Sequence, residues 1–132
     1  MSRIWQKEID QVLQTDLGPL GYRIQASDAQ GRDINFTLPG YFNYTVGGER
    51  ERRVLIQNLS PGHEQDINRL TQSGLISAAI DDEIVPVLTL QFQDGHVRAP
   101  ADPSIKTWRI TCDGTEITHI GTTLSRPDLL EL

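Results

Sequence analysis

The chain has 132 residues, of which 37% are hydrophobic and 23% charged, a composition that fits one folded domain and argues against disorder. Its formal net charge of −6 is unevenly distributed, because residues 1–60 carry seven basic and seven acidic side chains and residues 61–132 carry five basic and eleven acidic ones. An acidic balance of this kind opposes binding to nucleic-acid phosphates and favours a partner with a basic surface.

Neither a membrane span nor a secretory leader is predicted. No run approaches the roughly 20 apolar residues that cross a bilayer. The first eight residues carry charges where a signal peptide needs an apolar core. The single cysteine, Cys112, has no partner for an internal disulfide and suits a reducing compartment. We therefore expect a cytoplasmic protein.

The N-terminal segment predicts a helix followed by two strands. Ser2 is placed to cap a helix whose apolar residues recur at helical spacing, and Leu17-Gly18-Pro19 is placed to end it. The residues at that spacing are Trp5, Ile9, Val12 and Leu13. Apolar residues then alternate over 22–26 and over 34–38, which is typical of half-buried strands.

Three glycine-containing turn signals predict hairpins. Gly47-Gly48 separates strands at 41–46 and 49–56, and Asp94-Gly95 separates strands at 85–93 and 96–99. Asp113-Gly114 separates strands at 105–112 and 115–121. Folding the last pair about its turn places Ile110 opposite Ile117 on one face, with a polar face on the other side.

Between these hairpins the sequence predicts further helices. Ser60-Pro61 is an N-cap followed by a first-turn proline, Ile67 and Leu70 form an apolar stripe, and Gly74 is a natural stop. Residues 75–80 predict a second short helix. The fold class expected is therefore α+β: one domain over residues 1–132, a mostly antiparallel sheet of about six to eight strands built from hairpins, with two or three α-helices on one face.

No catalytic signature, metal-ligand spacing or phosphate-binding loop is present, so neither catalytic residues nor a metal or cofactor is predicted. The predicted hairpin places Trp108, Cys112 and His119 on one face. Cys112 lies two rungs from His119, too far for a nucleophile pair, which favours a structural cysteine. A small-molecule site or enzyme pocket near these three residues remains the alternative.

The candidate contact residues fall in three places. Asp81, Asp82 and Glu83 form the densest acidic cluster, which is either a solvated connection or a patch for a basic partner. Thr111 and Glu116 share the polar face of the last hairpin, and Tyr44 is a candidate interface anchor.

The function expected is that of a small acidic protein-binding module, best interpreted as an immunity or inhibitor protein that occupies the cationic site of a toxin or nuclease. An assembly or accessory protein is a third possibility. The oligomeric state and the role of the apolar tail at 129–132 stay open.

Overall fold

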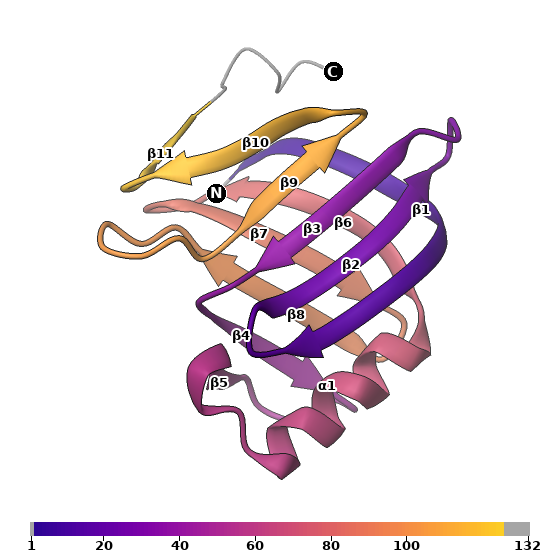
Figure 1. Ribbon diagram of the computed structural model, residues 1–132, viewed down its shortest axis with the longest axis vertical. Helices are drawn as coiled ribbons and strands as arrows, with labels where there is room; N and C mark the ends of the chain where they lie inside the picture. Colours follow the sequence, from indigo (N-terminus) through magenta and orange to yellow (C-terminus); the bar gives the residue numbers. More distant parts are fainter. Residues whose placement is uncertain (1, 126–132) are drawn as a thin grey trace.

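The computed structural model describes residues 2–125 as a nearly all-antiparallel β structure (Figure 1). Within this range, eleven strands form one sheet in the order β11-β10-β9-β3-β2-β1-β6-β7-β8-β4-β5. The first strands are β1 (Ser2–Gly18), β2 (Gly21–Asp28), β3 (Asp33–Leu38), β4 (Tyr41–Val46) and β5 (Arg52–Leu55). The others are β6 (Leu75–Asp82), β7 (Pro86–Phe92), β8 (Gly95–Pro100), β9 (Arg109–Cys112), β10 (Thr115–Ile120) and β11 (Thr123–Leu124). A short 3-10 turn, η1 (Ile56–Asn58), and one α-helix, α1 (Pro61–Ser73), lie between β5 and β6.

The long strand β1 is shared by two halves of the sheet. Its first part pairs with β6, and its second part, from Ile9 to Gly18, pairs with β2. The sheet folds over along this strand, so that β2 and β3 lie in front of β6, β7 and β8 (Figure 1). The inner faces of the two halves therefore meet.

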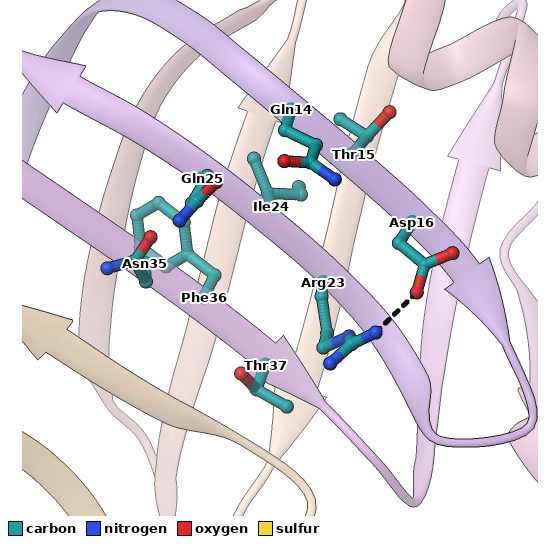
Figure 2. Close-up of a pocket in the computed structure, with 9 residues that line it drawn as sticks. All are labelled: Gln14, Thr15, Asp16, Arg23, Ile24, Gln25, Asn35, Phe36 and Thr37. Carbon is teal, nitrogen blue, oxygen red and sulfur yellow. Dashed lines mark hydrogen bonds and ion pairs between the residues drawn. The ribbon is translucent and has the colours of Figure 1, made fainter.

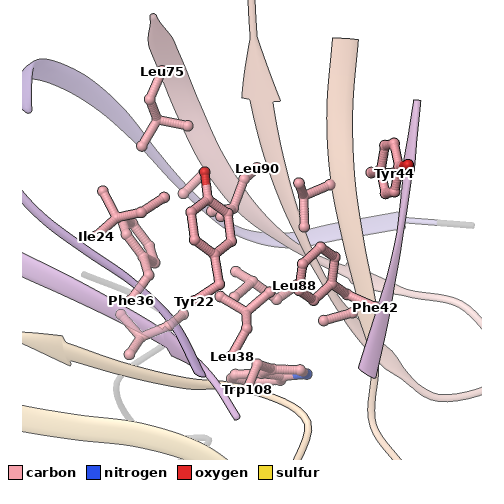
Figure 3. Packing of buried hydrophobic residues seen from close by; sticks show 14 of the residues in the cluster. Tyr22, Ile24, Phe36, Leu38, Phe42, Tyr44, Leu75, Leu88, Leu90 and Trp108 are labelled. Atoms are coloured by element: carbon pink, nitrogen blue, oxygen red, sulfur yellow. The ribbon is translucent and has the colours of Figure 1, made fainter. Parts of the chain in front are cut away.

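The core fills the space between the two halves (Figure 3). Alternate residues of β2 and β3, such as Tyr22 and Phe36, point toward Leu88 and Leu90 of β7, and all four are no more than 1% exposed. Trp108, which is 0% exposed, packs below them. The two-residue alternation of apolar and polar side chains thus builds one continuous core.

The predicted helix at 61–73 is confirmed. Ser60 caps α1 by accepting a hydrogen bond from the backbone N–H of His63 at 3.2 Å, and Pro61 occupies the first turn. Ile67 and Leu70 are buried and Gly74, with φ of 102°, ends the helix. α1 lies across one end of the folded sheet rather than on one of its faces (Figure 1).

The predicted α+β class is wrong, because the described residues contain one α-helix and the N-terminal segment is a strand. β1 is interrupted by shifts of register between Arg3 and Trp5, between Ile9 and Gln11, and between Val12 and Gln14. Each bulge adds one residue, so an interval of two between inward-facing residues becomes three. The interval from Trp5 to Ile9 is two ordinary strand steps, and the bulge after Ile9 lengthens the next step, to Val12, to three residues. Intervals of four and three together imitate a helical period.

Residues 75–80, predicted as a short helix, are also a strand. β6 lies between β1 and β7, and the second half of its apolar run is buried on both faces: Ala78, Ala79 and Ile80 are each at most 3% exposed. A short continuous apolar run does not distinguish a buried strand from a buried helix.

The hairpins are confirmed in outline, with different lengths. The Asp113-Gly114 turn and the pairing of Ile110 with Ile117 hold as predicted, although β9 begins only at Arg109. β5 begins at Arg52 rather than at residue 49. In the middle hairpin, Phe92 pairs with Gly95, so the turn residues are 93 and 94 and Gly95 is already part of β8.

Candidate functional site

Three connections meet at one end of the molecule, on the left of Figure 1: the β6–β7 turn, the segment between β8 and β9, and the β10–β11 turn. We refer to residues 83–85, 101–108 and 120–122 together as the loop end. The backbone N–H of Ala101 donates to the carbonyl of Pro86 at 2.9 Å, which joins the first two connections. Lys106 Nζ donates to the carbonyl of His119, which joins the second to the third.

Each connection of the loop end exposes one isoleucine. Ile84 is 102% exposed, Ile120 is 67% exposed and Ile105 is 42% exposed. Isolated exposed apolar residues are ordinary on protein surfaces, but three on connections at the same end of the molecule make that end a candidate interaction site. The loop end is therefore the candidate functional site.

His119 fixes the shape of the loop end from inside. The ring is 1% exposed, its Nδ1–H donates to the carbonyl of Gly121 at 2.8 Å, and its Nε2 accepts from the backbone N–H of Thr107 at 3.0 Å. Burial is the main cause that lowers the pKa of His119, so the ring is neutral at pH 7. The Thr107 hydroxyl in turn donates to the carbonyl of Pro100 at 2.6 Å. These bonds hold two of the three isoleucine-bearing connections in place.

A hollow of about 180 Å³ lies between residues 102–106 and residues 119–121, and Ile105 and Ile120 belong to its wall. Asp102 also lines it and supplies a negative charge. Its carboxylate accepts hydrogen bonds from the Tyr41 hydroxyl at 2.6 Å and from the backbone N–H of Ser104 at 2.7 Å. The bond from Tyr41 is the main cause that lowers the pKa of Asp102, which is therefore ionised at neutral pH.

The three residues of the predicted acidic cluster have different surroundings. Asp81 is 7% exposed, and it accepts hydrogen bonds from Arg3 at 2.9 Å and Thr89 at 2.8 Å. Burial alone would raise the pKa of Asp81. The hydrogen bonds from Arg3 and Thr89 together outweigh that effect, so the net shift of the pKa is downward. Glu83 is paired with Arg98. Asp82 is exposed, at the edge of the loop end.

The other predicted contact residues lie elsewhere. Thr111 and Glu116 pair across β9 and β10 on the outer face, as expected, and Glu116 lies 3.7 Å from Arg109. Tyr44 is 1% exposed and its hydroxyl donates to Asp66 at 2.7 Å, so the suggestion that it is an exposed anchor is wrong. The apolar tail at 129–132 lies outside the described residues.

The residues of the alternative pocket do not converge. Trp108 and His119 pack together with ring centroids 5.5 Å apart, and both are buried. Cys112 instead borders a separate hollow of about 160 Å³, beside Trp5 and Lys7. Burial is the main cause that raises the pKa of Cys112, and this disfavours the thiolate that a nucleophile needs.

The three isoleucines were not predicted as a site because they lie 21 and 15 residues apart in the sequence. No sequence signal marked them, because Ile105 and Ile120 fall within the predicted strands 105–112 and 115–121 and Ile84 lies between Glu83 and Val85.

Comparison with protein-family models, curated proteins and solved structures yields no match. Within residues 2–125, no helix has the length and apolar character needed to cross a membrane, and no three potential metal ligands are grouped together. The proposal below therefore rests on the geometry of this chain alone.

Proposed function

We propose that this chain is a protein-binding module of the immunity or inhibitor class, and that it contacts its partner through the loop end. The observation that carries the proposal is the exposure of Ile84, Ile105 and Ile120 on three adjoining connections. A reducing, cytoplasmic setting suits the unpaired thiol of Cys112.

The loop end has the composition of a specific protein interface, in which an apolar centre is surrounded by a polar rim. The isoleucines supply exposed apolar groups, and Asp82, Asp102 and Lys106 supply charged groups on or beside the same connections. Because His119 holds two of the connections, the surface is preorganised, and little conformational entropy is lost when it binds.

The charges favour a basic partner. Asp82 and Asp102 have no ion-pair partner within the described part of the chain, whereas Asp81 and Glu83 are already paired. A partner lysine or arginine fits the hollow between Ile105 and Ile120, since its aliphatic stem can pack on the isoleucines while its charge meets Asp102. A toxin or nuclease with a cationic site presents such side chains.

The test is recovery of a partner by variants that keep the fold. The tagged chain is incubated with an extract of the cells that produce it, and bound proteins are quantified by mass spectrometry. A double variant, Ile84→Ser with Ile120→Ser, should lose a basic protein that the unaltered chain retains. Leu20→Ser with Leu55→Ser is the matched control, because these leucines are 71% and 54% exposed but lie outside the loop end.

The recovered partner is then measured directly. Asp82→Lys should slow association, and the difference from the unaltered chain should shrink as salt rises, because exposed charges are screened beyond about 8 Å at physiological ionic strength. The proposal also requires that binding suppress the partner's activity. Recovery of the same proteins by the unaltered chain, the isoleucine variant and the leucine control would overturn the proposal. A dimer of the unaltered chain that is lost only in the isoleucine variant would also overturn it, and would assign the loop end to self-assembly.

A further inference from the structure

The outer face of β1, β2 and β3 carries a third hollow, of about 310 Å³, larger than the hollows at the loop end and beside Cys112 (Figure 2). Polar side chains from all three strands project around it, while the side chains of Ile24 and Phe36 lie behind the sheet in the core. The polar residues that line it are Gln14, Thr15, Asp16, Arg23, Gln25, Asn35 and Thr37.

Three primary amides form a row across this hollow. Gln14 pairs with Gln25 in the register of β1 and β2, and Gln25 pairs with Asn35 in the register of β2 and β3. Side chains opposite one another on neighbouring strands lie about 5 Å apart, so the amides can contact one ligand together. Each amide offers two N–H donors and a carbonyl acceptor.

The hollow has no net charge. Arg23 Nη2 lies 2.6 Å from Asp16 Oδ2, so these two charges form an ion pair. It is the one hydrogen bond or ion pair between the side chains drawn in Figure 2. The amides and the threonine hydroxyls are therefore free to bind a ligand, and no uncompensated cation is present to select a phosphate or sulfate. No aromatic side chain lines the hollow from its outer side, which disfavours a flat apolar ligand.

We infer that this hollow binds a neutral oligosaccharide. A sugar hydroxyl both donates and accepts, as does a primary amide, so a row of amides and hydroxyls is chemically complementary to a polyhydroxylated ligand. An extended peptide is less favoured, because peptides that bind sheets add to a strand edge, whereas the edges of β2 and β3 are already paired on both sides.

The same row continues beyond the hollow. Asn35 pairs with Thr111 of β9, and Thr111 pairs with Glu116 of β10. The polar face first predicted around Thr111 and Glu116 is thus the extension of the amide row, and its length suits several linked sugar units rather than one. This site is independent of the loop end and does not rest on the proposed function.

The inference is tested by NMR titration of the ¹⁵N-labelled chain with three probes: maltotriose, cellotriose and triacetylchitotriose. At least one should cause saturable shifts in the side-chain amide signals of Gln14, Gln25 and Asn35. The double variant Gln25→Ala with Asn35→Ala should bind it at least about fivefold more weakly, since two hydrogen bonds are lost and each contributes about 0.5–1.5 kcal/mol.

Gln6→Ala is the matched control, because Gln6 is an exposed glutamine in the part of β1 that pairs with β6, outside the hollow, and its loss should leave the affinity unchanged. Absence of a saturable shift with all three sugars would overturn the inference, as would equal affinity of the double variant. Stronger shifts with inorganic phosphate or with an extended peptide than with the sugars would also overturn it, in favour of an anion or peptide site.

Discussion

Gly95→Ala adds a single methyl group, and we expect it to lower the free energy of unfolding substantially. Gly95 begins β8 directly opposite Val46 of β4, and a Cβ built on it would lie far inside van der Waals contact with the carbonyl oxygen of Thr45. The same atom would lie 2.8 Å from the Thr45 carbonyl carbon and 3.1 Å from Leu70 Cδ1 of α1. A backbone carbonyl cannot rotate away, so Gly95→Ala must separate β4 from β8.

Overpacking a rigid site costs 1–3 kcal/mol, and a clash with backbone places this variant at the upper end, about 3 kcal/mol. For a domain of this size that corresponds to a fall in Tm of about 10 °C. Urea unfolding followed by tryptophan fluorescence measures the change. Gly18→Ala is the matched control, because nothing lies within 4 Å of its Cβ position, and it should be neutral. A Gly95→Ala variant as stable as Gly18→Ala would show that β4 and β8 are not paired in this register.

Three further outcomes are expected. Gly114→Val should cost about 1–2 kcal/mol, since φ is 84° there; an unchanged urea midpoint would show that the turn is wrongly assigned. Cys112 should react with a thiol reagent more slowly in the folded than in the unfolded chain, because burial raises its pKa; equal rates would place it on the open surface. Burial lowers the pKa of His119 more than the hydrogen bond to the Gly121 carbonyl raises it, and the charges of Lys106 and Asp102 act in opposite directions, so the net shift is downward and the unfolded state binds the proton first. Stability should therefore fall as pH drops below about 6.5, and His119→Asn should remove this dependence in urea titrations between pH 7 and pH 5.

The fold was predictable from sequence where one local signal determines one structure. Ser60-Pro61 and Gly74 delimit α1 because capping is local chemistry, and Asp113-Gly114 sets its hairpin because the two-residue turn needs positive φ. β1 was not predictable, because its bulges depend on pairing with β2 and β6, which lie elsewhere in the chain. A bulge leaves no mark in sequence beyond a changed interval between apolar residues.

The candidate sites were predictable only in part. The acidic cluster is visible because its residues are adjacent in sequence, but the sequence does not show that Arg3 and Thr89 cover Asp81 while Asp82 stays exposed. Ile84, Ile105 and Ile120 are far apart in the sequence, and the connections that carry them reach the same end of the molecule only in the folded sheet. Long-range pairing therefore decides which polar or apolar residues become a surface.

Because β1 belongs to both halves of the sheet, neither half is a complete folding unit. The half built on β2 and β3 lacks an edge partner without residues 9–18, and the half built on β6 and β7 lacks one without residues 2–8 of the same strand. The pairing of Ser2 with Asp82 spans much of the chain, so closing this contact is entropically demanding and should come late in folding. Unfolding should then be a single cooperative transition, and a stretch of β1 released from either neighbour would expose an unpaired edge that favours association between chains.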